Sequence, residues 1–236
     1  MRRALAGAAL ALALLSCRME PAKSDSIDGP KPRLNLLTSL PLVFGEGFAL
    51  GSEKHPLMAR LEQDFDVRLI DGPEELPPGG LLLAAQPQAL TAERLVSLDD
   101  WVREGGRMVL LADPQFVWES SRPLGDKGRP PVAYSDTGLL RHWGLRLSAG
   151  VEGPAVRRLG NADVLTGSPG LLEAEPGGHC KVSVDALVAR CSLGRGRAVV
   201  VADSDFVQAG VAGGLDGPTD ANHDALAAEL TALDRE

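Results

Sequence analysis

The residues of this sequence best suited to chemistry are carboxylates that directly follow apolar runs. Asp113 comes after one such run, and Asp203 and Asp205 come after another. Carboxylates at neighbouring strand ends can bind a divalent cation, which prefers oxygen ligands, and can serve a metal-assisted hydrolase. Asp is also a frequent turn and helix-capping residue. A structural role for these carboxylates is therefore the competing and more common interpretation.

Other polar side chains are expected at the same edge of the molecule. Ligands of open α/β sheets bind beyond the carboxyl ends of the strands, so polar residues that follow predicted strands belong to one crevice. The predicted ligand-binding set is Thr38, Ser39, Glu46, Gln86, Asp113, Asp203 and Asp205. Glu46, His142 and His223 are the further candidates for cation ligands, although the spacing matches no known metal-binding loop.

Other catalytic motifs are missing from the sequence. Residues 167–170 read Gly-Ser-Pro-Gly, which does not have the spacing of a nucleophile elbow. Neither a dinucleotide fingerprint nor a Walker sequence occurs, and the four histidines are dispersed. The sequence thus predicts no catalytic residue, no dedicated metal site and no cofactor.

The elements that must position these side chains alternate between short apolar runs and amphipathic stretches. This alternation is typical of parallel strands joined by crossover helices. The predicted strands are residues 33–38, 66–70, 81–85, 107–112 and 197–202, and the predicted helices are residues 56–64, 91–104, 135–143 and 219–233. A short strand is expected at 145–147 and an irregular β region at 151–178. We therefore predict an α/β fold with a mostly parallel, twisted sheet flanked by helices, and with a β-hairpin insertion.

That hairpin is predicted from two cysteines. The spacing of Cys180 and Cys191 places them opposite each other if Asp185 and Ala186 form a two-residue turn. In an oxidising compartment the two thiols form a disulfide. Two free, buried thiols are the alternative interpretation.

The first 17 residues have the order of a secretory signal. Two arginines precede an apolar run that ends at Leu15, and this run is too short to span a bilayer as a helix. Residues 14–17, Leu-Leu-Ser-Cys, resemble a bacterial lipobox, which implies lipidation of Cys17. An ordinary cleaved signal with an incidental cysteine is the alternative.

The predicted domain organisation follows from this leader. Residues 1–17 are the signal peptide, residues 18–32 a flexible tether, and residues 33–236 one α/β domain. We expect the chain to lie at the periplasmic face of a bacterial membrane, held there by its lipid anchor. By resemblance to lipoprotein sorting rules, Arg18 rather than Asp at this position favours the outer membrane.

The charge of the chain disfavours nucleic acid as a partner. The sequence has 24 Lys and Arg against 32 Asp and Glu, a net charge of −8, and loss of the signal peptide removes two further arginines. Proteins that bind phosphate backbones need clustered Lys and Arg instead.

Two stretches resemble a known domain family. The first is residues 81–114, with a strand, a helix that starts near Thr91, a Gly-Gly helix end and a strand closing with Asp-Pro. The second is residues 194–206, which ends in Asp-Ser-Asp-Phe. Both resemble the glutamine-amidotransferase-like α/β domain of the GldG-type auxiliary proteins of ABC transporters and the related domain family DUF4350.

The resemblance implies a flavodoxin-like or class I glutamine-amidotransferase-like fold without catalysis. True amidotransferases place a Cys after a central strand, where this sequence has Gln86 and Asp113. The expected function is a noncatalytic binding or accessory lipoprotein, with ABC transporter subunits or a glycan as partner. The alternative is a metal-assisted hydrolase that uses the strand-end carboxylates.

Overall fold

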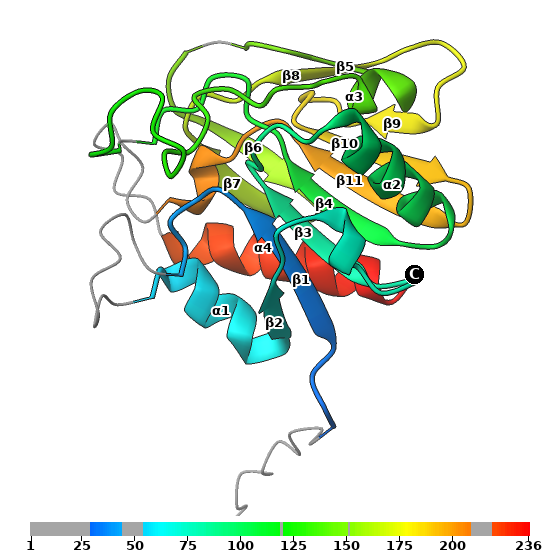
Figure 1. Ribbon diagram of the computed structural model, residues 1–236. Coiled ribbons are helices and arrows are strands. Elements are labelled where there is room, and N and C mark those ends of the chain that lie inside the picture. Colours follow the sequence, from blue (N-terminus) through cyan, green and yellow to red (C-terminus); the bar gives the residue numbers. More distant parts are fainter. Residues whose placement is uncertain (1–28, 44–53, 119, 151, 209–218) are drawn as a thin grey trace, which may run out of the picture. The chain divides into compact units, whose positions relative to one another are not determined.

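Seven strands form the central sheet of the protein, whose computed structural model describes residues 29–43, 54–118, 120–150, 152–208 and 219–236. The sheet order is β2-β1-β3-β4-β11-β10-β9 (Figure 1). The strands are β1 (Arg33–Thr38), β2 (Asp66–Leu69), β3 (Leu81–Ala85), β4 (Arg107–Leu111), β9 (Cys180–Val182), β10 (Val188–Leu193) and β11 (Gly196–Val201). Strands β2, β1, β3, β4 and β11 pair in parallel. The prediction of a mostly parallel sheet is thus confirmed.

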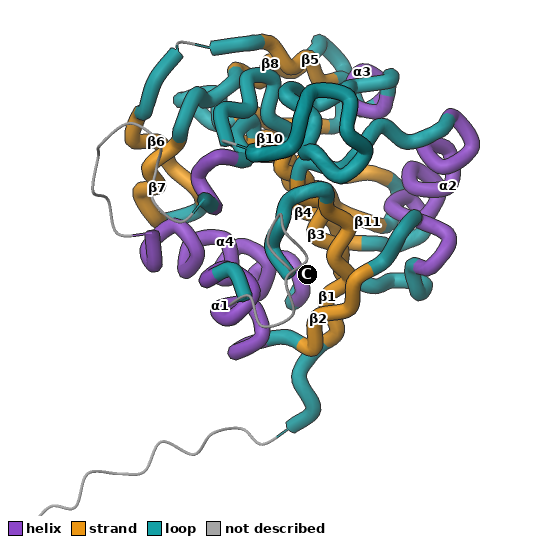
Figure 2. Tube along the Cα trace, turned by 60° about the vertical axis from the view of Figure 1, so that its left-hand side comes forward, coloured by secondary structure: helices purple, strands orange, loops and turns teal. Residues whose placement is uncertain are grey.

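Helices cover both faces of this sheet, as Figure 2 shows. Helices α1 (Pro56–Asp64) and α4 (Thr219–Asp234) pack on one face, and α2 (Ala92–Arg103) and the short α3 (Leu139–His142) pack on the other. The five parallel strands have the order of a flavodoxin-like sheet, with its topological switch point between β1 and β3. None of the helices in the described part of the chain is long and apolar enough to cross a membrane.

Strand β3, in the centre of the sheet, forms where the sequence is apolar without interruption. All five residues of β3 are buried, because side chains that alternate between the two faces meet helices on both. Helix α2 begins at the predicted cap, where the Thr91 side chain accepts a hydrogen bond from the main-chain N–H of Arg94. It ends before Gly105, whose φ of 117° suits a residue without a Cβ.

Two small antiparallel pairs lie outside the main sheet. Strand β5 (Leu145–Ser148) pairs with β8 (Leu171–Ala174), and β6 (Ala155–Leu159) pairs with β7 (Ala162–Thr166). The irregular β region expected at 151–178 therefore contains the three regular strands β6, β7 and β8.

The helix expected at residues 135–143 is shorter than predicted. It covers only Leu139–His142, because Gly138 immediately before it has a left-handed φ of 114°. The Asp136 side chain accepts hydrogen bonds from the N–H groups of Gly138 and Leu140, both at 3.1 Å, and thereby caps this short helix.

The disulfide between Cys180 and Cys191 is present. The two cysteines are direct partners in the antiparallel pairing of β9 and β10, in the predicted register. The hairpin also continues the main sheet beyond β11. Its turn is wider than two residues, since the regular pairing of β9 with β10 stops at Val182 and Ala189.

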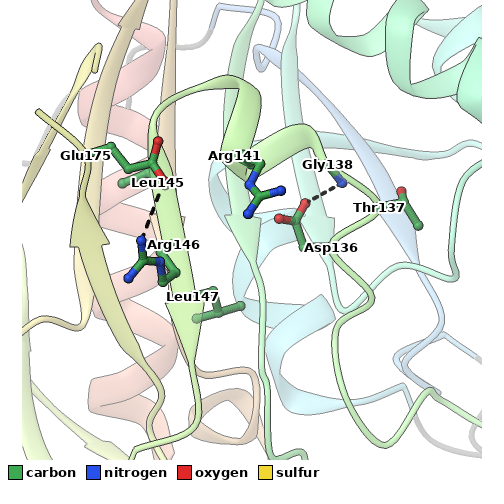
Figure 3. A pocket seen from close by; sticks show the side chains of 8 residues that line it. All are labelled: Asp136, Thr137, Gly138, Arg141, Leu145, Arg146, Leu147 and Glu175. Atoms are coloured by element: carbon green, nitrogen blue, oxygen red, sulfur yellow. Dashed lines mark hydrogen bonds and ion pairs between the residues drawn. The ribbon is translucent and has the colours of Figure 1, made fainter. Parts of the chain in front are cut away.

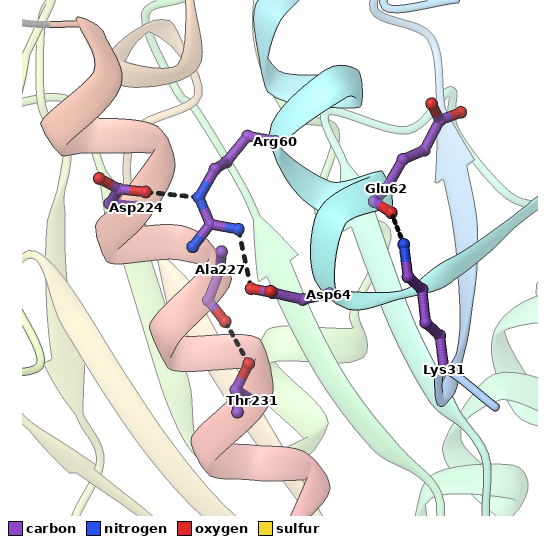
Figure 4. A network of polar contacts seen from close by, with 7 residues as sticks. All are labelled: Lys31, Arg60, Glu62, Asp64, Asp224, Ala227 and Thr231. Carbon is purple, nitrogen blue, oxygen red and sulfur yellow. Dashed lines mark hydrogen bonds and ion pairs between the residues drawn. The ribbon is translucent and has the colours of Figure 1, made fainter. Parts of the chain in front are cut away.

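Charged side chains join α1 to α4 at the surface. Arg60 lies between Asp64 of its own helix and Asp224 of α4 (Figure 4). Exposed ion pairs of this kind contribute about 0.5 kcal/mol each, so the helix packing rests on the apolar contacts beneath them.

The residues before Gly29 include the predicted signal peptide, Cys17 and most of the predicted tether. They lie outside the described residues. Residues Lys31–Glu236 form one compact unit.

Candidate functional site

Three carboxyl groups meet at the carboxyl edge of the sheet. Asp113 follows β4, while Asp203 and Asp205 follow the adjacent parallel strand β11. One oxygen from each carboxyl lies within 4.8 Å of the others. The three residues are 0 to 1% exposed. The predicted convergence is therefore observed, but as a buried cluster, which we call the acidic triad.

Main-chain N–H groups bind every oxygen of the acidic triad. Asp113 accepts from Gln115 at 2.8 Å and from Ser204 at 2.8 Å. The two oxygens of Asp203 accept from Gly167 at 3.1 Å and from Phe206 at 2.7 Å, and those of Asp205 accept from Val117 at 3.2 and 3.0 Å. The triad thus joins the ends of β4 and β11 to the loops that follow β4 and β7.

Gly167 must be a glycine for this arrangement. A Cβ at this position would lie 2.6 Å from the Cβ of Asp205, closer than real Cβ atoms approach. The close contact also aims the Gly167 N–H at Asp203. The loop after β7 therefore closes directly over the triad.

Gln86 occupies the bend after β3 and is fully buried. Its φ of 43° lies in the left-handed region, which a side chain rarely adopts and which indicates local strain. The Gln86 side chain accepts from the Asp113 N–H and the Ser204 hydroxyl, both at 3.0 Å. It donates to the carbonyls of Asp113 and Pro131, both at 3.2 Å. The amide is thus fully engaged with the neighbouring strand ends.

Thr38 and Ser39 link the end of β1 to the end of β3, at the topological switch point of the sheet. The Thr38 hydroxyl donates to the Ala85 carbonyl at 2.8 Å, and the Ser39 hydroxyl donates to the Gln86 carbonyl. These bonds hold together the two strand ends between which ligands of this fold class bind. Glu46, the remaining predicted member of the crevice, lies outside the described residues.

Burial and mutual repulsion favour protonation within the acidic triad. Burial raises the pKa of Asp113. Burial, together with the charges of the other two carboxyls, raises the pKa of Asp203 well above its usual range. Burial, followed by the charge of Asp113, raises the pKa of Asp205 to about 7. A hydrogen bond between the Asp113 and Asp205 carboxyls lowers the pKa of the first and raises that of the second, as a shared proton does.

The triad fits a divalent cation in its ligand chemistry but not in its surroundings. Three carboxylates within reach of one another are the oxygen ligands that Mg²⁺ and Ca²⁺ prefer. Each oxygen already faces an N–H dipole, whose positive end repels a cation. The triad is also shut off from solvent, whereas Mg²⁺ usually keeps several waters. The geometry therefore suits a proton-sharing structural network better than a metal centre.

The proposed histidine ligands lie elsewhere. His223 is buried on α4, with Nε2 3.0 Å from the Val207 carbonyl, and its ring centre is 5.8 Å from that of His55. His142 Nε2 is 3.4 Å from Asp99. Neither belongs to the cluster of potential metal ligands found among the described residues.

His55 is a feature that sequence analysis missed. Its Nδ1 accepts the N–H of Leu57 and caps α1, and its ring lies 5.4 Å from that of Trp118. Its Nε2 is buried without a hydrogen-bond partner in the described part of the chain. Burial, and secondly the charge of His223, lowers the pKa of His55 to about 4, so the ring is neutral. The signal in the sequence was a His immediately before a Pro that starts a helix.

Comparisons with known proteins identify the fold but no family. No protein-family model matches the sequence, and neither does any curated protein. Among solved structures, a β-galactosidase from Bacillus circulans sp. alkalophilus matches with a TM-score of 0.50 and 14% identity, over 85% of this chain and 31% of that one.

Two smaller proteins also match. The mmIFT52 N-terminal domain has a TM-score of 0.49 and 14% identity, over 85% of this chain and 97% of that one. A cytoplasmic protein from Salmonella typhimurium LT2 has a TM-score of 0.48 and 13% identity, over 75% of this chain and 85% of that one. The chain spans about a third of the length of the glycosidases that it matches. These likenesses concern the fold alone, a class I glutamine-amidotransferase-like α/β domain.

Proposed function

We propose that this chain is a noncatalytic binding or accessory lipoprotein, anchored through Cys17 at the periplasmic face of a bacterial membrane. The observation that supports a noncatalytic function is that the polar side chains at the carboxyl ends of the strands are buried and hydrogen-bonded. The polar side chains there are engaged with main-chain groups, and the acidic triad is 0 to 1% exposed. A reacting group must instead reach its substrate within hydrogen-bond distance.

Gln86 supports this proposal most directly. It stands on a strained bend after a central strand, the kind of position at which hydrolases of α/β folds expose a nucleophile. An amide side chain is not a nucleophile, and this one is buried. Its hydrogen bonds stabilise the end of β4. We therefore assign the bend a structural role.

The proposed partners are subunits of an ABC-type transport system or a glycan. They are suggested by the resemblance of residues 81–114 and 194–206 to the GldG-type and DUF4350 domains. The outer membrane is the favoured location, because Arg18 follows the proposed lipidated cysteine. Separation of inner from outer membranes decides between the two partners: a chain in the outer membrane supports the glycan, and a chain in the inner membrane supports the transporter subunits.

The proposed anchor would join the domain at one edge of its sheet. Strand β1 starts at Arg33, at the amino edge of the sheet, and the acidic triad lies at the opposite edge (Figure 1). A tether of residues 18–32 would reach at most about 50 Å when extended. An anchored domain could therefore rotate freely and present its side surfaces to a partner.

Lipid attachment is tested by labelling cells with a palmitate analogue and separating their membranes. We expect label on the wild-type chain, and loss of both label and membrane association in Cys17→Ala. An unlabelled wild-type chain, or a membrane-bound Cys17→Ala variant, would contradict the anchor. The alternative of an ordinary cleaved signal predicts an unlabelled, released protein.

A metal-assisted hydrolase remains the second candidate, because three carboxylate oxygens lie within 4.8 Å of one another. Elemental analysis of the purified protein separates the two functions. We expect no stoichiometric metal and no rise in melting temperature with millimolar Mg²⁺, Mn²⁺ or Zn²⁺, since a ligand of the folded state would raise it. Stoichiometric metal that is lost in Asp113→Asn would support the hydrolase instead.

A further inference from the structure

We infer that the hollow between α3 and β5 binds an extended acidic peptide segment of a partner protein. The peptide would pair with the open edge of β5 and place a carboxylate on Arg141. This inference concerns a surface away from the acidic triad. It does not depend on whether Cys17 carries a lipid.

The hollow has a volume of about 480 Å³. It is lined by Asp136, Thr137, Gly138, Arg141, Leu145, Arg146, Leu147 and Glu175. Figure 3 shows the Arg141 side chain between the end of α3 and strand β5, with Asp136 on its other side. The space can hold a few residues of an extended chain, and its walls are largely polar.

Strand β5 offers main-chain hydrogen-bonding groups to such a chain. One edge pairs with β8 from Leu145 to Ser148. For the other edge, the described part of the chain provides no main-chain hydrogen bonds. A free strand edge presents a row of N–H and C=O groups, which is the template that extended peptides use when they add a strand to a sheet.

The lining of the hollow has two arginines and two carboxylates, and Arg141 is the member that favours a carboxylate on the peptide. Arg141 is exposed and has no ion pair or hydrogen bond among the described residues. Asp136 caps α3 through the N–H groups of Gly138 and Leu140 and makes no ion pair with Arg141. Arg146 has Glu173 and Glu175 nearby, at 3.5 and 3.8 Å. A guanidinium left free in this way binds a carboxylate through two parallel hydrogen bonds.

A second hollow continues the first across Thr137 and Gly138. Its volume is about 390 Å³, and its walls include the apolar side chains of Ala92, Leu95, Val96 and Leu139. Val96 is 60% exposed there, so it has room for an apolar contact. Successive side chains of an extended peptide point in opposite directions. A peptide that alternates apolar and acidic residues thus matches both hollows at once.

Two synthetic peptides test the inference by NMR titration of the folded protein. The first is acetyl-Val-Glu-Val-Glu-Val-Glu-amide, and the second has Lys in place of Glu. We expect saturable binding of the Glu peptide, with the largest amide shifts in β5 and α3, and no comparable binding of the Lys peptide. The variant Arg141→Gln should weaken binding by about tenfold, the loss expected for one charge-assisted contact.

The matched control is Arg157→Gln. Arg157 lies on β6 and, like Arg141, has no carboxylate partner among the described residues. This control should bind the Glu peptide like the wild type. The inference is overturned by an absence of saturable binding at millimolar peptide, by equal binding of the two peptides, or by equal weakening in the two variants. Concentration-dependent dimerisation through β5 would also overturn it, since a second copy would then occupy the edge.

Discussion

The acidic triad and the α3–β5 hollow use the same kinds of polar residue in opposite ways. Asp203 is fully buried and accepts two main-chain hydrogen bonds, whereas Asp136 is exposed and caps a helix of four residues. Both polar atoms of the Gln86 amide are hydrogen-bonded, whereas the Arg141 guanidinium has no partner among the described residues. Among the described residues, the polar groups at the strand ends thus stabilise the fold, while Arg141 on a side surface keeps its hydrogen-bonding groups for the partner proposed above.

This difference has an energetic basis. A buried polar group destabilises the folded state unless it is hydrogen-bonded, so each carboxyl of the triad and its main-chain donors depend on each other. An exposed group loses little when its partner is removed, because water replaces the contact. Substitutions should therefore separate the two regions clearly.

The largest effect is expected for Asp203→Ala. The substitution leaves the N–H groups of Gly167 and Phe206 without an acceptor inside the protein, and each such loss costs about 1 to 3 kcal/mol. We expect a loss of about 4 kcal/mol in the free energy of unfolding, measured with urea. Asp136→Ala, which removes an exposed cap, should cost about 1 kcal/mol. Equal losses would remove the distinction between the two regions.

The next largest effect is expected when the disulfide is removed by Cys180→Ala with Cys191→Ala. The cross-link closes a short loop, and its loss should cost about 3 kcal/mol. It holds edge strand β9, and the hairpin carbonyl of Ala186 binds the N–H of Leu172 in β8, the partner of β5. Hydrogen exchange should accordingly accelerate more in β5 and β8 than in β4. Uniform acceleration would show that the two regions are not independent.

A smaller effect is expected from pH. Burial and charge repulsion raise the pKa of Asp205 to about 7 and that of Asp203 well above its usual range, so the folded protein holds protons that the unfolded chain has released. The resulting stabilisation is complete below the unfolded pKa and is lost as pH rises through the folded pKa. The unfolding free energy should fall by about 2 kcal/mol from about pH 6.5 to about pH 8.

The variant Asp205→Asn should flatten this slope, because an amide does not titrate. Below the unfolded histidine pKa, His55 partly offsets the trend set by the carboxyl groups. Burial lowers the pKa of His55 from 6.5 to about 4, so the unfolded chain gains a proton first and the contribution of this residue to stability falls as pH falls. A wild-type protein whose stability rises from about pH 6.5 to about pH 8 would contradict the assignment.

The smallest effects are expected at exposed arginines. Arg60→Ala removes contacts to Asp64 and Asp224 and should cost less than about 1 kcal/mol (Figure 4). Arg141→Gln should change stability by less than about 0.5 kcal/mol, since Arg141 has no partner among the described residues. Thermal unfolding measures both. A larger loss for Arg141→Gln would mean that the hollow is held together by this side chain.

The sequence was sufficient to predict the central strands and the edge of the sheet at which the polar residues that follow them converge. Strands at residues 33–38 and 81–85 were found with their observed bounds, because strands buried on both faces are rich in apolar residues, and 81–85 is apolar throughout. The convergence of Asp113 with Asp203 follows from the parallel pairing of β4 with β11. The disulfide followed from the spacing of its cysteines.

The burial of the acidic triad could not be predicted in this way. Its cover is made by irregular loops, whose main-chain N–H groups at Gln115, Val117 and Gly167 are donors whatever the residue type. Such donors leave no pattern in a sequence. The hollow at Arg141 was missed because its lining includes Asp136, Thr137 and Gly138, which the sequence assigned to a helix but which precede α3.

The most direct test of the account is a pH titration of the side-chain carboxyl ¹³C signals of Asp113, Asp203 and Asp205, with and without millimolar Mg²⁺. We predict that the triad keeps at least one proton near pH 6.5, that the signals shift together because the groups share it, and that Mg²⁺ leaves them unchanged. Three carboxylates that are fully ionised at that pH, with signals that respond to Mg²⁺, would show an open metal site and would contradict the account.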